Sequence, residues 1–203
     1  MPSYRPTTPQ GLVDLCADRL AQLPGIVIAG FDGADAADPA WLAGSVAGVL
    51  RAAGRAADVV RVEDFIRPAS QRLEYGAHDE LTYRTTWFDY PAIRREVIDA
   101  ARLHGRWLPR LWNAKTDRSF RDSPRAAPDR QILIIAGPML ARDELELDLV
   151  VRVRMSRATL ERRTPPDDLW TIAPLLDYED TAADPDIEVR YDHPDRPAVW
   201  VRM

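Results

Sequence analysis

The sequence predicts an α/β protein in which a parallel sheet is covered by helices on both faces. Residues 26–29 and 132–135 are short, wholly apolar runs that are typical of buried strands. Segments with helix-capping residues and helical spacing alternate with such runs along the chain. Strands buried on both faces and separated by helices predict a three-layer sandwich. In such sheets ligands bind beyond the carboxyl ends of the strands, so the residues that follow each strand are the first candidates for function.

In the first half of the chain, the expected elements have recognisable start or stop signals. Thr8-Pro9 and Asp38-Pro39 each combine a capping side chain with a first-turn proline, and Gly105 is a typical helix stop. The expected elements are a helix from residue 8 that Pro24-Gly25 ends, a strand at 26–29, a helix from 38 to just before 54, a strand at 59–62 and a helix from 90 to about 104.

The second half of the chain is expected to complete the sheet and to cover the ligand edge. The expected elements are strands at 107–112, 132–135 and 147–153, a short helix capped by Ser156, a proline- and aspartate-rich lid or loop region at 164–186, and a hairpin formed by 188–191 and 199–202. These elements predict a single domain over residues 1–203, with a parallel central sheet of about five strands and a short lid region at about 156–186.

Composition excludes several classes of protein. The 203 residues are 46% apolar, which is ordinary for a globular domain and excludes disorder as the main state. A net charge of −5 and the lack of a basic stripe argue against nucleic acid as a partner. The sequence has no run of 18 apolar residues, so no membrane span is predicted, and residues 1–10 lack the apolar core of a signal peptide. With Cys16 as its single cysteine, the chain is expected to be cytoplasmic.

The segment after the first predicted strand lies where a phosphate-binding loop would lie. Such a loop needs glycines for close backbone approach, a lysine for the phosphates and a Ser/Thr hydroxyl for magnesium. Gly30, Asp32 and Gly33 match the first half of G-x-D-G-x-x-x-x-G-K-[ST], and here the sequence resembles the uridine kinase family of P-loop nucleoside kinases. Asp38, Pro39 and Ala40 replace the second half, so the resemblance implies a P-loop kinase-like fold with a degenerate Walker A motif.

The resemblance extends over nearly the whole chain and implies roles for residues on the acceptor side. Arg61-Val62-Glu63-Asp64-Phe65 is similar to the strand end that carries the family's catalytic base, which implies that role for Glu63. Trp87-Phe88-Asp89-Tyr90-Pro91 is similar to a segment whose aspartate holds the ribose, which implicates Asp89.

Other matched segments have lost the family's characteristic side chains. Asn113 and Ala114 stand where related kinases carry an acid and a histidine, and Ala136 replaces the acid that normally ends the fourth strand. Arg162 and Arg163 match the arginine-bearing helix of the family's lid.

Charge at the loop argues against ATP-dependent phosphotransfer. Asp38 at a helix start would itself occupy the favourable anion position, and Asp32 and Asp35 would add like charge against a triphosphate. Lys115 is the chain's only lysine and is expected on another strand. Positioning and charge stabilisation make up nearly all of phosphoryl-transfer catalysis, and this loop lacks the lysine and the hydroxyl that would supply them. We therefore expect neither ATP nor magnesium as a cofactor. ATP and magnesium would be needed only if the chain is an active kinase.

The acceptor side retains residues that could bind or transform a ligand. Glu63, Asp64 and Asp89 are expected to lie together near Asp32, where close carboxylates would raise one pKa and give a candidate acid/base pair. The alternative is that these acids are solvated and idle. The other candidate ligand-binding residues are Tyr83, Arg84, Trp87, Phe88, Asn113 and Lys115, although aromatic side chains more often pack in a core. His78, His104 and His193 lack metal-ligand spacing, so no metal site is predicted.

Three functions remain open from the sequence. The first is a pseudoenzyme or pseudokinase that uses the former acceptor pocket for binding or regulation. The second is ATP-independent acid/base chemistry in that pocket. The third is an active uridine or cytidine kinase with an unorthodox phosphate loop. An acidic pocket predicts a small polar or nucleoside-like partner that is neutral or cationic and rich in hydroxyls, and a homo-oligomer is left open.

Overall fold

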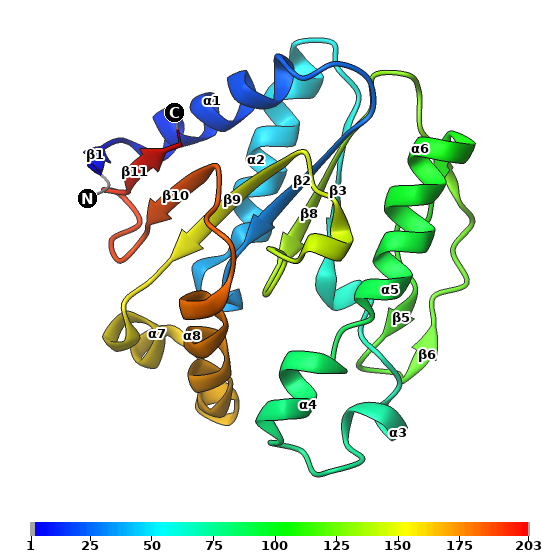
Figure 1. Cartoon of the computed structure of the whole chain (residues 1–203), viewed down its shortest axis with the longest axis vertical. Coiled ribbons are helices and arrows are strands. Elements are labelled where there is room, and N and C mark those ends of the chain that lie inside the picture. Colours follow the sequence, from blue (N-terminus) through cyan, green and yellow to red (C-terminus); the bar gives the residue numbers. More distant parts are fainter. Residues whose placement is uncertain (1–2, 203) are drawn as a thin grey trace.

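The computed structural model describes residues 3–202, and its centre is a seven-stranded sheet (Figure 1). The strand order is β1-β11-β10-β9-β2-β8-β3. The five strands β10, β9, β2, β8 and β3 run parallel, whereas β11 and β1 are added antiparallel at one edge. In chain order the strands are β1 (Arg5–Pro6), β2 (Val27–Asp32), β3 (Ala57–Arg61), β8 (Ile132–Gly137), β9 (Leu149–Arg154), β10 (Ile187–Arg190) and β11 (Ala198–Val201).

The predicted parallel sheet of about five strands is confirmed, but one predicted member is wrong. Residues 107–112 do not join the sheet. They contribute instead to two short hairpins, in which β4 (Arg106–Trp107) pairs with β7 (Arg125–Ala126) and β5 (Trp112–Asn113) pairs with β6 (Arg118–Ser119). Pro109 interrupts the run and has no N–H for a ladder, which confines such a segment to edges and turns. The fifth parallel strand is β10, the first strand of the predicted closing hairpin.

Helices cover both faces of the sheet. Figure 1 shows α1 (Pro9–Ala21) and α2 (Pro39–Ala52) on one side, and α5 (Tyr90–Ile93) and α6 (Ala100–His104) on the other. A π-helical turn, η3 (Arg94–Asp99), joins α5 to α6 into one continuous helical segment. The predicted caps are present, because the side chains of Thr8 and Asp38 accept hydrogen bonds from amides of the first turns of α1 and α2.

The segment expected to be a lid or loop at 164–186 is largely helical, which corrects that prediction. It contains the 3₁₀ helix η5 (Pro166–Thr171) and the helix α8 (Ile172–Thr181), and it follows α7 (Arg157–Arg163). Pro174 lies in the first turn of α8, where a proline costs no hydrogen bond, so its presence does not argue against a helix. Buried Ile172 and Leu175 attach α8 to the core.

Short helices surround the carboxyl ends of the strands. Figure 1 shows α3 (Ala69–Arg72) and α4 (Glu80–Thr85) on one side of this edge and α8 on the other. The 3₁₀ turns η1 (Asp35–Ala37), η2 (Val62–Asp64) and η4 (Asp143–Leu145) follow β2, β3 and β8. No helix within residues 3–202 is long and apolar enough to cross a membrane.

A buried ion pair joins the end of β2 to β9. Asp32 and Arg152 lie 3.2 Å apart, and both side chains are 3% exposed. The Asp32 carboxylate also accepts hydrogen bonds from the Leu140 amide at 3.1 Å and from the Tyr178 hydroxyl of α8 at 3.0 Å. Burial raises the pKa of Asp32, while Arg152 opposes that rise. This network attaches both α8 and the segment after β8 to the middle of the sheet.

We expect Asp32→Asn to reduce the free energy of unfolding by about 3–5 kcal/mol, because it leaves the Arg152 guanidinium buried without a counter-charge. Urea unfolding at pH 7 would measure the change. Asp184→Asn is the matched control, because Asp184 is 79% exposed in its ion pair with Arg202, and its loss is expected to move the midpoint little. Equal effects of the two substitutions would contradict the structural role of Asp32.

Candidate functional site

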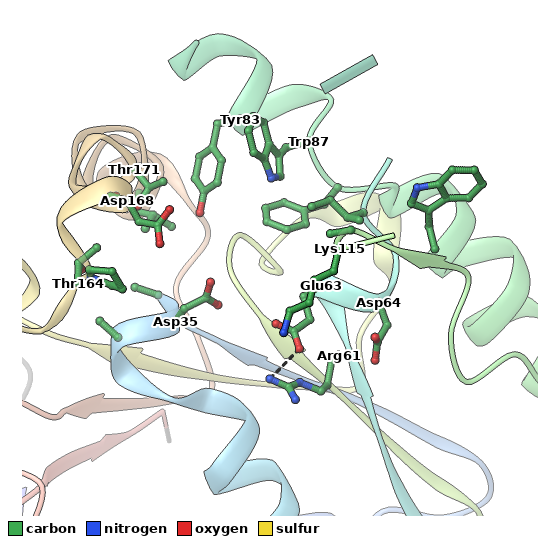
Figure 2. A pocket seen from close by; sticks show the side chains of 18 of the residues that line it. Asp35, Arg61, Glu63, Asp64, Tyr83, Trp87, Lys115, Thr164, Asp168 and Thr171 are labelled. Atoms are coloured by element: carbon green, nitrogen blue, oxygen red, sulfur yellow. Dashed lines mark hydrogen bonds and ion pairs between the residues drawn. The ribbon is translucent and has the colours of Figure 1, made fainter. Parts of the chain in front are cut away.

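A cavity of about 680 Å³ lies beyond the carboxyl ends of the strands, in the size range of small-molecule sites. Five parts of the chain line it: the β2–α2 loop, the end of β3 with η2, the 83–88 segment, the 112–120 segment, and residues 164–175. Figure 2 shows side chains from these segments converging on one space. The site is therefore built from distant parts of the sequence on a common sheet edge.

Most of the predicted ligand-binding residues come together in this cavity. The predicted residues that line it are Glu63, Asp64, Tyr83, Trp87, Phe88, Asn113 and Lys115. Asn113 has a local role as well, since its side-chain oxygen accepts hydrogen bonds from the amides of Lys115 and Thr116 and shapes the turn. The binding and catalytic roles assigned to these side chains remain predictions.

Asp32 and Asp89 do not line the cavity, contrary to the expectation that they lie with Glu63 and Asp64. Asp32 is committed to Arg152, as described above. Asp89 is the N-cap of α5, where it accepts a hydrogen bond from the Ala92 amide at 3.1 Å, and it lies 3.6 Å from Arg67. An aspartate before a proline at a helix start is ordinary capping chemistry, which gives Asp89 a structural explanation.

The three predicted arginines also lie outside the cavity lining. Arg84 faces Asp177 of α8 at 3.9 Å. Arg162 is exposed and donates a weak hydrogen bond to the Thr159 hydroxyl at 3.3 Å, and Arg163 is half-buried on the same helix. The lid region instead contributes uncharged and acidic residues to the cavity, namely Thr164, Pro165, Asp168, Trp170, Thr171 and Leu175.

Acidic side chains outnumber basic ones in the lining. The four carboxylates are Asp35, Glu63, Asp64 and Asp168, and the two cations are Arg61 and Lys115. Arg61 is paired with Glu63 at 2.8 Å, as the dashed line in Figure 2 marks. Within residues 3–202, neither Lys115 nor any of the other three carboxylates forms an ion pair within 4.0 Å.

Two of these carboxyl groups have shifted acidities. Burial raises the pKa of Asp35, and Glu63 and Asp168 raise it further against the opposing effect of Arg61. Burial also raises the pKa of Asp64, again with a contribution from Glu63. Raised carboxyl pKa values bring these groups closer to neutral pH, where a proton can be held or released.

Aromatic rings form one wall of the cavity. Tyr83 packs against Trp87 with ring centroids 5.7 Å apart and against Trp170 at 5.2 Å, and Trp87 and Trp170 are 5.5 Å apart. We call these three residues the aromatic wall. Trp170 and Asp168 were not among the predicted site residues, because they lie in the segment expected to be a loop. A tryptophan within an acidic, proline-rich segment was the available signal, since such a large ring needs a surface to pack on.

The predicted phosphate loop encloses a second, much smaller space of about 150 Å³, which Asp35, Asp38 and Glu63 line together with Arg61. Asp38 accepts a hydrogen bond from the Trp41 amide at 3.0 Å, and Pro39 has no amide hydrogen. The amides of Ala37 and Asp38 donate to carbonyls within the loop at 2.8 and 2.9 Å. These backbone donors are therefore already satisfied by the protein.

The two loop glycines have packing roles. A Cβ at Gly33 would lie 2.8 Å from the Val153 carbonyl oxygen, and a Cβ at Gly30 would lie 2.5 Å from the Leu147 side chain. Close approach of the β9 backbone requires glycine at Gly33, whereas a side chain at Gly30 would require the Leu147 side chain to move. Within residues 3–202, no group of three or more His, Cys, Asp or Glu side chains lies close enough together to hold a metal ion.

Comparison with known proteins gives matches to solved structures only. No family model matches the chain, and no curated protein matches it. A possible uridine kinase from Bacillus stearothermophilus superposes with a TM-score of 0.67 and 18% identity, over 85% of this chain and 92% of that chain. A candidate fructose transport system kinase from a Silicibacter species has a TM-score of 0.67 and 20% identity, over 87% and 98%.

A D-glycerate 3-kinase from Cryptococcus neoformans is more distant, with a TM-score of 0.50 and 12% identity over 89% of this chain and 92% of that chain. At these identities the likeness concerns the fold alone. It confirms the predicted P-loop kinase-like sandwich.

We expect Asp35→Asn to raise the melting temperature at pH 7. The folded-state pKa of Asp35 is raised, so its ionisation opposes folding above that pKa, and the penalty disappears as the pH falls and the carboxyl group is protonated. The groups that influence it are Glu63, Asp168 and Asp38, which repel its charge, and Arg61, which attracts it. Thermal melts from pH 3 to pH 8 would show a gain that shrinks at low pH. A variant that is less stable than the parent at pH 7 would contradict this electrostatic assignment.

Proposed function

We propose that this chain is a kinase-fold protein that does not use ATP as a phosphate donor and that binds a small polar molecule in the 680 Å³ cavity. The observation that carries the proposal is the contrast between two adjoining spaces. The former phosphate position is small and lined by three carboxylates, whereas the neighbouring cavity is large enough for a metabolite.

The donor side supports the proposal through both its backbone and its charge. A phosphate at a helix N-terminus needs free amides and a favourable dipole. At α2 the Asp38 carboxylate binds the Trp41 amide, Pro39 offers no donor, and Asp35 adds a further negative charge. Magnesium-bound ATP does not fit this set of residues, so no step of the proposed function passes through it.

The acceptor side supports binding of a polar ligand with a flat or apolar face. The aromatic wall offers ring surfaces for stacking, while Glu63, Asp64, Asn113 and Lys115 offer hydrogen-bonding groups on the other side. Most small-molecule sites combine predominantly apolar surface with a few placed polar groups in this way. The expected ligand is therefore a hydroxyl-rich or nucleoside-like metabolite.

A second candidate function is ATP-independent acid/base catalysis in the same cavity. The specific observation in its favour is the raised pKa of Asp64, to which the neighbouring Glu63 charge contributes, because such a carboxyl group can act as an acid or a base. Asp89, which caps α5, is not part of this candidate pair.

Magnesium-ATP is expected to leave the melting temperature unchanged, whereas a cavity ligand is expected to raise it. A ligand at 100 times its Kd adds about 2.7 kcal/mol of stability, or roughly 5–10 °C in Tm for a chain of this size. A thermal-shift screen with ATP, GTP, uridine, cytidine, UMP, sugars and amines would test both statements. Stabilisation by magnesium-ATP, or phosphorylation of a nucleoside above a no-enzyme blank, would replace the proposal by an active kinase.

Glu63→Gln separates binding from catalysis once a ligand is known. A binding protein is expected to keep most of its affinity, because Glu63 is exposed and already paired with Arg61. An acid/base enzyme that uses Glu63 is expected to lose about 100-fold or more in rate. Calorimetry and turnover of the same ligand would give the two readouts. Asp143→Asn, in an exposed turn outside the cavity, is the matched control for both.

A further inference from the structure

Two carboxylates on the aromatic side of the cavity lack a protein counter-charge. Asp35 and Asp168 line the cavity and form no ion pair within 4.0 Å in residues 3–202. Figure 2 shows both carboxylates facing the same space, with Arg61 turned toward Glu63. Asp168 is one of the charges that raise the pKa of Asp35. Both residues are partly open to solvent, and a positively charged ligand in the cavity would supply a counter-charge through charge-assisted hydrogen bonds.

The aromatic wall adds a second surface that attracts cations. The faces of tryptophan and tyrosine rings carry negative electrostatic potential, and a cation within about 6 Å of a ring centroid is stabilised. Arg72, which does not line the cavity, already lies 5.1 Å from the centroid of Trp87. Among the described residues, no arginine or lysine occupies the rings of Tyr83 or Trp170 in this way. The His78 ring packs against the Trp170 ring, with centroids 5.2 Å apart.

The Tyr83 hydroxyl is a further polar group at the same place in the cavity. Tyr83 is only 6% exposed, and its hydroxyl is directed into the cavity between Asp35 and Asp168 (Figure 2). Thr171 is its hydrogen-bonding neighbour, and the hydroxyl is not among the buried polar atoms of residues 3–202 that lack a partner. A ligand oxygen at this point would therefore add one hydrogen bond to a group that the cavity already presents.

Resting on the proposed binding function, we infer that the ligand is a hydroxylated organic amine. Its ammonium group lies against the aromatic wall and donates to the carboxylates of Asp35 and Asp168, and one of its oxygens accepts the hydrogen bond of the Tyr83 hydroxyl. The sequence predicts a ligand that is either neutral or cationic, and the inference selects the cationic ligands. It also assigns specificity to Asp168 and Trp170, two residues outside the predicted site.

The test uses pairs of ligands that differ only in charge. Glucosamine, ethanolamine and 2-deoxystreptamine would be titrated into the full chain, each beside its N-acetylated form, with glucose and uridine as neutral references. Calorimetry and intrinsic tryptophan fluorescence are both suitable, since Trp87 and Trp170 line the cavity. We expect at least one amine to bind and its N-acetylated partner to bind about 10-fold or more weakly, the loss of one charge-assisted interaction.

Matched variants locate the binding. Asp168→Asn is expected to weaken amine binding about 10-fold, whereas Asp167→Asn, its exposed neighbour outside the lining, is expected to leave it unchanged. Trp170→Leu keeps an apolar side chain but removes the π face, and is expected to weaken the amine about 3- to 30-fold. Trp41→Leu, on the exposed face of α2, is the control for loss of a tryptophan. Circular dichroism and Tm would confirm that each variant is folded.

The outcomes separate this inference from the function on which it rests. Equal binding of an amine and its N-acetylated form, or binding of uridine or glucose in place of every amine, would overturn the charge inference and keep the proposed small-molecule site. Amine binding that Asp168→Asn and Asp167→Asn affect equally would also overturn it, because the contact would lie elsewhere. Binding of magnesium-ATP with no response to any amine or neutral reference would overturn both.

Discussion

The interaction between Asp32 and Arg152 is the constraint on which the arrangement of the site depends. Burying two charges is costly, and the cost is offset only when geometry and additional hydrogen bonds are good. Here Leu140 and Tyr178 supply those bonds from two further segments. The pair thereby sets the positions of the β2–α2 loop and of the segment 164–181 that ends in α8. These two segments carry Asp35 and Asp168 to the same side of the cavity, beside Tyr83.

The same carboxylates underlie both proposals, namely that ATP is not the donor and that the ligand is an amine. Carboxylates at a helix start oppose a triphosphate, and carboxylates beside aromatic rings attract an ammonium group. Asp35 belongs to both spaces, since it lines the small one at the start of α2 and the large one beside Tyr83. In the proposed function, acids in place of phosphate-binding residues change the preferred charge of the ligand, while the sheet that holds the site stays the same.

Local signals allowed the fold to be predicted, while pairings between distant residues did not follow from them. Apolar runs located β2, β8 and β9, and Thr8 and Asp38 marked two helix starts. Asp32 was assigned to a ligand because its partner lies 120 residues away, although Arg152 is the charged residue inside a buried strand and was the available clue. Asp89 is followed by a first-turn proline, Pro91, as Asp38 is by Pro39, so the same capping rule accounts for both. The position of Trp170 in the cavity was not predicted, because it lies in a helical segment whose prolines indicate a loop.

The Tyr178 hydroxyl has a consequence for how a ligand exchanges with solvent. It donates to Asp32 and accepts a hydrogen bond from the Ala141 amide at 2.7 Å, so swinging α8 outward would break both bonds and expose a buried charge. The 112–120 segment on the opposite rim is held by the two-residue ladder of β5 with β6 and by exposed hydrogen bonds that Asp117 accepts from the Ala69 amide and the Trp112 indole. Entry and exit are therefore expected past this hairpin, with α8 acting as a fixed wall and not as a gate. Amide hydrogen exchange would show this as rapid opening in residues 112–120 while the amides of α8 stay protected.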